Sequence, residues 1–244
     1  MIQHKKKILI FALSILSSGL LIGCSSITNN PTTNASEQTY SSQDYENSFQ
    51  KLSEVLNISK DELENKLTLK NNDNTYQLVP ATNTSKNLNF YKDLVVYGDK
   101  EYTKLYFQNK KMKDERQAEN YYNSYLNEMR KKSPPDLYFF LTFLNNEPAG
   151  IISTSSLTDS EEITIGYITE QSKSNRKVGT NSMKMLVEFL KYMKSTNVYH
   201  YQKLSLWIFD ENISSIKVAQ NNGFTLSDTN KDKQMSKYTL NLKN

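Results

Sequence analysis

The spacing of apolar positions changes along the chain, and each spacing predicts one type of element. Apolar residues three or four positions apart indicate amphipathic helices, whereas short apolar runs bounded by turn residues indicate strands. Helices are predicted over residues 87–107, 114–132, 178–194 and 212–222. Strands are predicted over residues 75–80, 137–144, 149–153, 162–169, 203–209, 224–227 and 235–242. This order, a strand, two helices, three antiparallel strands and then helix, strand, helix and hairpin, indicates an α+β domain.

Two short helices are predicted before this domain, within residues 44–70. Tyr45, Phe49 and Leu52 recur at helical spacing, and Ser59 with Glu62 forms the pattern of a capping box at the start of a second helix. We expect this helical extension to pack on the main domain as an N-terminal cap. A helical hairpin that binds a partner is the alternative.

The chain begins with a basic segment and an apolar run from Ile8 to Ile22, which is the layout of a secretory signal peptide. The run is too short for a membrane span of about 20 residues. The ending Leu21-Ile22-Gly23-Cys24 resembles a bacterial lipobox. This resemblance implies that residues 1–23 are removed and that a lipid on Cys24 anchors the protein to the extracytoplasmic face of the bacterial cell membrane. An uncleaved N-terminal anchor is the alternative.

Residues 24–43 are dominated by Ser, Thr, Asn and Gln and hold almost no aliphatic side chains. Such a segment buries too little apolar surface to offset the loss of chain entropy on folding. We therefore expect a flexible tether between the lipid anchor and the folded part of the chain.

The composition excludes several kinds of site. A single cysteine allows no intramolecular disulfide and no zinc site built on several thiolates, and the histidines His4 and His200 cannot form a multi-histidine site, so no metal is predicted. The formal charge of +4 includes three lysines of the signal peptide, without which 27 basic residues face 26 acidic ones. This balance offers no basic surface for nucleic acid.

Two segments resemble the GNAT family of acyl-CoA N-acyltransferases. One is ITIGYITEQSKSNRKVGTNSMKMLVEFL at residues 163–190, and the other is SLWIFDENISSIKVAQNNGF at residues 205–224. The second contains the Asn-x-x-Ser and Gly-Phe signature, and together with Gly166-Tyr167 it is similar to the ribosomal-protein N-acetyltransferase branch. The resemblance implies that residues 75–244 form a GNAT fold, a mixed and mostly antiparallel sheet flanked by helices, with acetyl-CoA as co-substrate and an amine as acceptor.

A pyrophosphate is expected at the start of the helix at residues 178–194, because a helix N-terminus presents backbone N–H groups and a positive dipole end. The family loop carries two glycines here, but this sequence has Lys177 at the first position and Gly179 at the second. A positive φ at Lys177 would be strained. A plain basic helix start is the alternative. The candidate CoA-binding residues of this loop are Asn175, Arg176, Lys177, Val178, Gly179 and Thr180.

The remaining candidates follow from the resemblance. Backbone N–H groups of Tyr167, Ile168 and Thr169 are expected to hold the thioester carbonyl, and the side chain of Tyr167 is expected to contact substrate or to pack. The resemblance implies that Asn212 corresponds to the family's asparagine that contacts the pantetheine arm of CoA. From its residue type and position alone, Asn212 is expected to be a helix N-cap.

Two residues are candidates for proton transfer. Many family members carry a tyrosine that protonates the departing thiolate, but Ala219 occupies that position, so the resemblance implies Ser215 in this role. A hydroxyl bonded to the preceding helical turn is the alternative for Ser215. Among the carboxylates near the central strand, Glu161, Glu162 and Glu170, Glu162 is preferred as general base because strand alternation places it opposite Ile163.

Two functions remain open from the sequence. The first is N-acetyl transfer from acetyl-CoA to a primary amine by direct attack in a ternary complex. The second is a catalytically degenerate surface lipoprotein that binds a ligand or a protein, and the missing loop glycine and the missing tyrosine favour this reading. Export conflicts with the cytoplasmic location of acetyl-CoA, and an acyl donor outside the cell or a domain released or retained elsewhere would also resolve that conflict. A V-shaped opening beside Tyr167 supports the enzyme, whereas a closed sheet or a side chain that fills the opening supports the binder. The sequence identifies neither the acceptor amine nor the oligomeric state.

Overall fold

The computed structural model describes residues 40–71, 73–98, 112, 114–131, 137–156, 161–196 and 199–242. The predicted signal peptide, the lipidation site Cys24 and nearly all of the predicted tether lie outside the described residues. Within the part of the chain that the structure describes, no helix is both long and apolar enough to cross a membrane.

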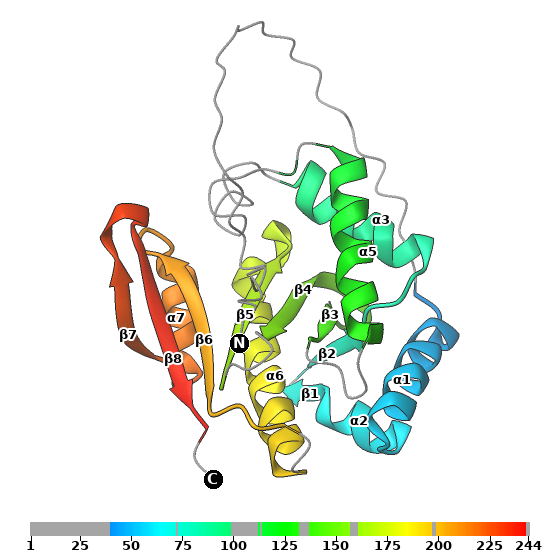
Figure 1. Cartoon of the computed structure of the whole chain (residues 1–244). Helices are drawn as coiled ribbons and strands as arrows, with labels where there is room; N and C mark the ends of the chain where they lie inside the picture. The colour runs from blue at the N-terminus through cyan, green and yellow to red at the C-terminus, as the bar shows by residue number, and fades with distance from the viewer. Residues whose placement is uncertain are drawn as a thin grey trace, which may run out of the picture. The chain divides into compact units, whose positions relative to one another are not determined.

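An eight-stranded sheet forms the centre of the molecule, with the order β1-β2-β3-β4-β5-β6-β8-β7 (Figure 1). The strands are β1 (Thr68–Asn71), β2 (Asn74–Pro80), β3 (Phe139–Leu144), β4 (Glu147–Ser156), β5 (Glu162–Thr169), β6 (Lys203–Phe209), β7 (Thr225–Asn230) and β8 (Met235–Asn241). Neighbours pair antiparallel except β5 and β6, which pair parallel. The predicted α+β class with a mixed, mostly antiparallel sheet is confirmed.

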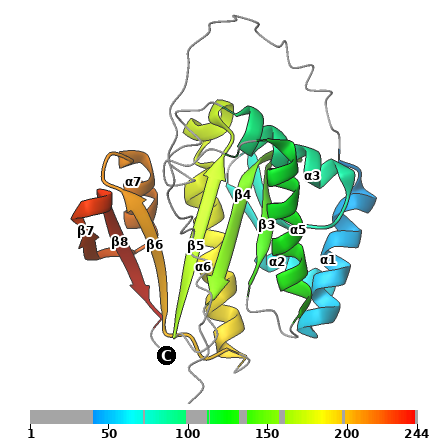
Figure 2. The ribbon, with the colours of Figure 1, turned by 45° about the horizontal axis from the view of Figure 1, so that its top comes forward.

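Helices cover both faces of this sheet. They are α1 (Ser42–Leu56), α2 (Lys60–Lys66), α3 (Ser85–Lys92), α5 (Glu115–Lys131), α6 (Val178–Ser195) and α7 (Ile213–Asn221), with 3-10 turns η2 (Gln171–Arg176) and η3 (Lys231–Lys233). Successive residues of β3 show how the layers form, because strand side chains alternate between faces. Phe140 packs against Phe189 of α6, whereas Phe139 packs against Tyr91 of α3 and Tyr122 of α5. Figure 2 shows α6 behind the sheet and α5 in front of it.

The N-terminal extension packs against the domain. Phe49 of α1 and Leu63 of α2 are almost completely buried, and Tyr45 stacks edge-on against Phe143 of β3 at 5.1 Å. The Tyr45 hydroxyl also donates to the backbone oxygen of Asn146 at 3.0 Å. These contacts fit the interpretation of an N-terminal cap. The extension also supplies β1, a strand that the sequence pattern did not predict, because its four residues are too few to show alternation.

The predicted helix over residues 87–107 is partly wrong. The helix α3 begins at Ser85, because the Thr84 side chain accepts a hydrogen bond from the backbone N–H of Asn87 and so caps the helix two residues earlier. It then continues as a π-helical turn, η1 (Asp93–Tyr97). Residues 99–111 lie outside the described residues.

Two features mark the ends of the sheet. At one end, β1 is only four residues long and carries Lys70. At the other end, β7 is exposed along nearly its whole length, and its register against β8 shifts between Leu226 and Asp228. Both outer strands are therefore irregular or short.

Gly150 is required where β4 passes β5. A β-carbon at this position would overlap the backbone oxygen of Ile168 and lie 2.9 Å from the Cα atom of Thr169. Because both neighbours are backbone atoms, neither can rotate away. We expect Gly150→Ala to lower the free energy of unfolding by about 2 kcal/mol, measured by urea titration. Ser155→Ala, in the same strand, is the control, and equal stability of the two variants would contradict this account of β4.

Candidate active site

The strands β5 and β6 separate soon after they meet. They pair only at Glu162↔Lys203, Ile163↔Leu204 and Thr164↔Ser205. Beyond these residues β5 continues to pair with β4 as far as Thr169, and β6 continues to pair with β8. Figure 2 shows the two strands in contact at one end and apart at the other. The backbones of the two strands therefore diverge in the V expected beside Tyr167, and we call this separation of the backbones the opening.

The orientation of the β5 backbone can be determined from its hydrogen bonds. The Glu170 N–H donates to the backbone oxygen of Ala149 in β4, and the Glu161 oxygen accepts from the backbone N–H of Lys203 in β6. Since successive peptide groups of a strand point to opposite sides, the N–H groups of Tyr167 and Thr169 point toward the β6 side. The N–H of Ile168 points toward β4. Of the three backbone groups predicted to hold a thioester, two are directed toward the opening and Ile168 is not.

The start of α6 is shaped by Lys177. This residue lies in the left-handed region, with φ 59° and ψ 18°, between η2 and α6, and its side chain forms no cap. The positive φ predicted at Lys177 is therefore present. The first N–H groups of α6, from Val178, Gly179 and Thr180, lie at the end of an 18-residue helix where the helix dipole favours an anion.

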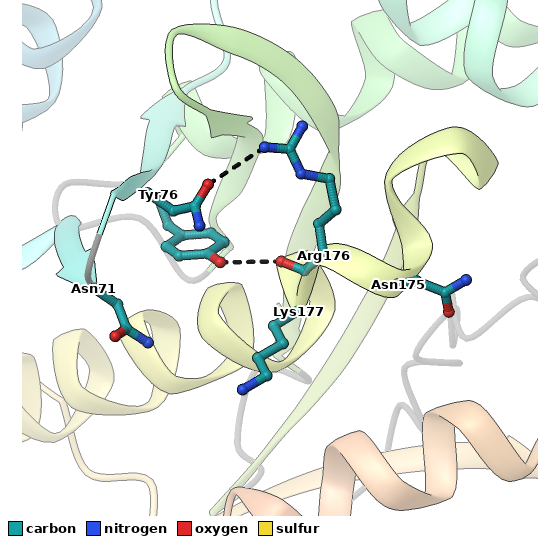
Figure 3. Close-up of a pocket in the computed structure, with 6 residues that line it drawn as sticks. Asn71, Tyr76, Asn175, Arg176 and Lys177 are labelled. Carbon is teal, nitrogen blue, oxygen red and sulfur yellow. Dashed lines mark hydrogen bonds between the residues drawn. The ribbon is translucent and has the colours of Figure 1, made fainter.

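Neighbouring residues of β2 hold this turn in place. The Tyr76 hydroxyl donates to the backbone oxygen of Arg176 at 3.0 Å, and the Arg176 guanidinium donates to Asn74 Oδ1 at 3.3 Å. Figure 3 shows Arg176 reaching toward β2, whereas Asn175 points away from it. Beside the turn lies a polar pocket of about 230 Å³. It is lined by Asn71, Asn74, Tyr76, Asn175, Arg176 and Lys177.

Gly179 allows a tyrosine ring to lie against the helix. A β-carbon on Gly179 would be 3.1 Å from the Tyr167 ring and 3.7 Å from side-chain carbons of Thr169 and Val218. The group that lies against Gly179 in this structure is the ring of Tyr167. This contact places Tyr167 on the α6 side of the sheet.

The start of α7 brings two predicted residues together. Asn212 is the N-cap, and its Oδ1 atom accepts a hydrogen bond from the backbone N–H of Ser215 at 3.1 Å. Ser215 Oγ in turn accepts a hydrogen bond from the Tyr167 hydroxyl at 3.0 Å. Ala219, one turn further along, is completely buried. Tyr167, Gly179, Asn212 and Ser215 thus form one cluster between β5, α6 and α7.

Glu162 does not belong to this cluster. It begins β5 where that strand still pairs with β6, and strand alternation places it on the opposite face from Tyr167. Five residues separate the two along β5, which corresponds to about 16 Å. Glu162 forms an ion pair of 2.7 Å with Lys237 of β8. Its role as a general base stays a prediction.

Burial and hydrogen bonding act in opposite directions on Glu162. Desolvation favours the neutral acid, but the hydrogen bonds from Lys237 and Ser205 outweigh it and lower the pKa of Glu162 below its usual value of 4.5. The ionised form is therefore stabilised by the fold. Glu170, by contrast, follows the open end of β5 and accepts a hydrogen bond from Ser172 at 2.6 Å.

Two functional contacts could not be inferred from the sequence. Tyr76 and Asn74 lie about a hundred positions before the turn that they hold, and no local pattern links them to Arg176. The hydrogen bond between Tyr167 and Ser215 also joins distant segments, although both residues were candidates individually. Tyr76 and Asn74 reach Arg176 only because β2 pairs with the rest of the sheet.

The sequence of the chain matches a known family. Residues 85–225 match the family described as "Acetyltransferase (GNAT) domain". This match covers more than half of the chain, so the protein belongs to the GNAT acetyltransferase family. A search of curated proteins gives no significant match.

Solved structures of acetyltransferases share this fold. RimL, a ribosomal L7/L12 alpha-N-protein acetyltransferase in complex with coenzyme A, is 16% identical with a TM-score of 0.57, and the alignment covers 68% of this chain and 94% of RimL. RimJ from Mycobacterium smegmatis is 13% identical with a TM-score of 0.55, with 68% of this chain and 82% of RimJ covered. An acetyltransferase from Salmonella typhimurium is 14% identical with a TM-score of 0.54, with 70% and 95% covered.

The ion pair of Glu162 predicts a pH-dependent stability. Because the pKa of Glu162 is lowered by folding, its contribution is complete above about pH 4.5 and is lost as the pH falls through the native pKa. We expect Glu162→Gln to lower the free energy of unfolding by about 1 kcal/mol at pH 7. The difference from wild type should shrink in urea titrations as the pH falls below 4.5 toward the lowered native pKa. Glu161→Gln is the control, and a pH-independent difference for Glu162→Gln would contradict this assignment.

Proposed function

We propose that this domain transfers an acetyl group from acetyl-CoA to a primary amine by direct attack in a ternary complex. The observation that carries the proposal is the separation of β5 from β6 next to the start of α6. The opening offers a path for an extended thioester arm, and the helix end offers a site for its phosphates. Membership of the GNAT acetyltransferase family supports both assignments.

The phosphates of the donor are assigned to the turn before α6. The N–H groups at the start of α6 supply hydrogen-bond donors, and the exposed Lys177 adds positive charge. Arg176 keeps its predicted role as a phosphate contact in this proposal. Its guanidinium is also bonded to Asn74 and its backbone oxygen to Tyr76, and these two bonds hold the left-handed turn at Lys177.

The reaction requires a carbonyl polarised toward attack. The amine nitrogen forms a bond with the thioester carbon, the carbonyl oxygen gains negative charge, and the carbon–sulfur bond then breaks with its electron pair leaving on sulfur. The N–H groups of Tyr167 and Thr169, which point toward the β6 side, are assigned to the oxyanion. The attacking amine loses one proton to a base and the thiolate gains one. Glu162, the residue predicted as base, lies about 16 Å from Tyr167 along β5 and is ion-paired with Lys237, so it does not contact this reaction centre directly.

The acceptor class to test first is a peptide N-terminus. RimL is described as an alpha-N-protein acetyltransferase, and this chain shares its fold. Lysine side chains, aminosugars and polyamines are the other classes of primary amine that the same chemistry accepts. A screen that compares these four classes identifies the acceptor.

Isothermal titration with acetyl-CoA tests donor binding. We expect a dissociation constant on the order of micromolar for the wild-type protein. Lys177→Glu should weaken binding at least about tenfold, because it reverses the charge beside the assigned phosphates. Lys184→Glu, an exposed position on the same helix, makes the same charge change away from the turn and should bind like wild type.

A second pair of variants separates capping from donor binding. Asn212→Ser keeps a side chain that caps helices well, whereas Asn212→Ala removes the cap at a cost of about 1 kcal/mol in stability. Weaker acetyl-CoA binding by both variants assigns a ligand contact to Asn212. Weaker binding by Asn212→Ala alone assigns it only the cap.

Absence of acetyl-CoA binding by the wild-type protein would overturn the proposed function and favour a lipid-anchored binding module.

We also propose that the mature protein is anchored through a lipid on Cys24. The support is the sequence alone: a basic start, an apolar run and the single cysteine of the chain at the expected cleavage position. We expect the mature N-terminus to be a diacylglyceryl-modified Cys24 by mass spectrometry, with partition of the protein into detergent. Cys24→Ala should abolish both and retain residues 1–23. An unmodified Cys24 in a membrane-bound, uncleaved chain would refute lipidation.

A further inference from the structure

The hydroxyl of Tyr167 bridges the central strand and the helix that bears Ser215. It donates to Ser215 Oγ at 3.0 Å, across the side of the opening where α7 begins. Asn212 fixes the same serine from the other direction, because it accepts a hydrogen bond from the Ser215 backbone N–H at 3.1 Å. The Ser215 hydroxyl is therefore bonded to β5, while Asn212 caps the start of the helix that carries Ser215.

The ring and the hydroxyl of Tyr167 have separate contacts. The ring lies against Gly179, where a β-carbon would be only 3.1 Å away. This packing needs an aromatic ring but no hydroxyl, so phenylalanine would fulfil it equally. The hydroxyl contributes only polar contacts, including the hydrogen bond with Ser215. The hydrogen bond with Ser215 is the one that joins the hydroxyl to α7.

The phenol of tyrosine is a much stronger acid than the hydroxyl of serine, and this difference affects which group can supply a proton to a thiolate. A phenol has a pKa of about 10 and a thiol about 8.5, so proton transfer between them is nearly balanced. An aliphatic hydroxyl is a much weaker acid, and a serine that gave up its proton alone would be left with an unfavourable alkoxide. A serine that is simultaneously reprotonated by a phenol avoids this state.

The direction of the hydrogen bond suits such a transfer. Because Ser215 Oγ accepts the hydrogen of Tyr167, the serine's own hydrogen must point away from the tyrosine. Ala219, one turn after Ser215 in the same helix, has no hydroxyl. The phenol of this site comes from β5 and not from α7.

We propose that Tyr167 supplies, through Ser215, the proton that neutralises the departing CoA thiolate. When the carbon–sulfur bond breaks, the sulfur lone pair takes the Ser215 hydrogen and Ser215 takes the Tyr167 hydrogen. The tyrosinate then recovers a proton from solvent. Over the whole reaction the amine loses one proton and the thiol gains one. Tyr167 is in this sense a positioning residue and proton source, and Ser215 is the catalytic residue. The inference rests on the proposed function.

The ionisation of CoA bound to the protein tests the inference without an acceptor. A hydroxyl that donates to sulfur stabilises the thiolate, so bound CoA should have a thiol pKa lowered by about one unit relative to free CoA. The pKa is measured from the ultraviolet absorbance of the thiolate as pH is raised. Tyr167→Phe and Ser215→Ala should each abolish most of the shift. Tyr45→Phe loses a comparable hydrogen bond to Asn146 far from this cluster and should retain the shift.

Kinetics with the best acceptor add a second measurement. Tyr167→Phe should lower kcat about a hundredfold while the acetyl-CoA dissociation constant stays within about twofold. The double variant with Ser215→Ala should be no slower than Ser215→Ala alone, because the two hydroxyls act as one unit. Additive losses would contradict a shared proton path.

The outcomes separate the two proposals. If CoA binds and its thiol pKa is the same in wild type and both variants, the proton path is wrong and the acetyltransferase proposal stands. If only Ser215→Ala changes the thiol pKa, the proton comes from Ser215 without Tyr167 and the inference is overturned. If CoA does not bind to the wild-type protein, both proposals fall together.

Discussion

The ladder between β5 and β6 stops after three residue pairs, and the arrangement of the active site depends on this limit. Each strand is paired with its other neighbour, β5 with β4 from Ile163 to Thr169 and β6 with β8 over its whole length. Neither strand can turn back toward the other without breaking that pairing, so the sheet stays divided where the chain leaves both strands. The turn before α6 and the turn before α7 follow directly from these two strand ends, which places Lys177 and Asn212 on the two sides of the opening.

Within this frame one side chain determines how close the two helices can lie to β5. The ring of Tyr167 lies between the start of α6 and the side of α7 that carries Val218 and Ser215. Gly179 leaves room for this ring, because a β-carbon there would lie only 3.1 Å from it. Gly179 thus serves both the packing of the Tyr167 ring and the proposed binding of phosphate. The other glycine of the family loop is replaced by Lys177. Hydrogen bonds from Tyr76 and to Asn74 hold the adjacent Arg176 and so stabilise the left-handed conformation of Lys177.

The sequence predicted best those elements whose cause is local. The bounds of β5 and β6 agree with the predicted ranges, and α6 and the Asn212 cap follow from apolar spacing and a capping side chain. The positive φ of Lys177 was predictable because the family pattern places a glycine there. The hydrogen bonds of Tyr76 and the partnership of Glu162 with Lys237 were not predictable, because they join segments that only the folded sheet brings together. The short β1 was missed because four residues carry too little pattern.

The two open edges of the sheet bear on how the protein behaves at high concentration. An exposed strand offers a row of peptide groups to which another chain can add, and this is a common route to aggregation. Here one edge is too short for a stable addition, and the other is interrupted by the register shift between Leu226 and Asp228, which also places a carboxylate on the strand. These features make edge-to-edge polymerisation unfavourable, so the domain should remain unassociated through its sheet even when many copies are crowded together.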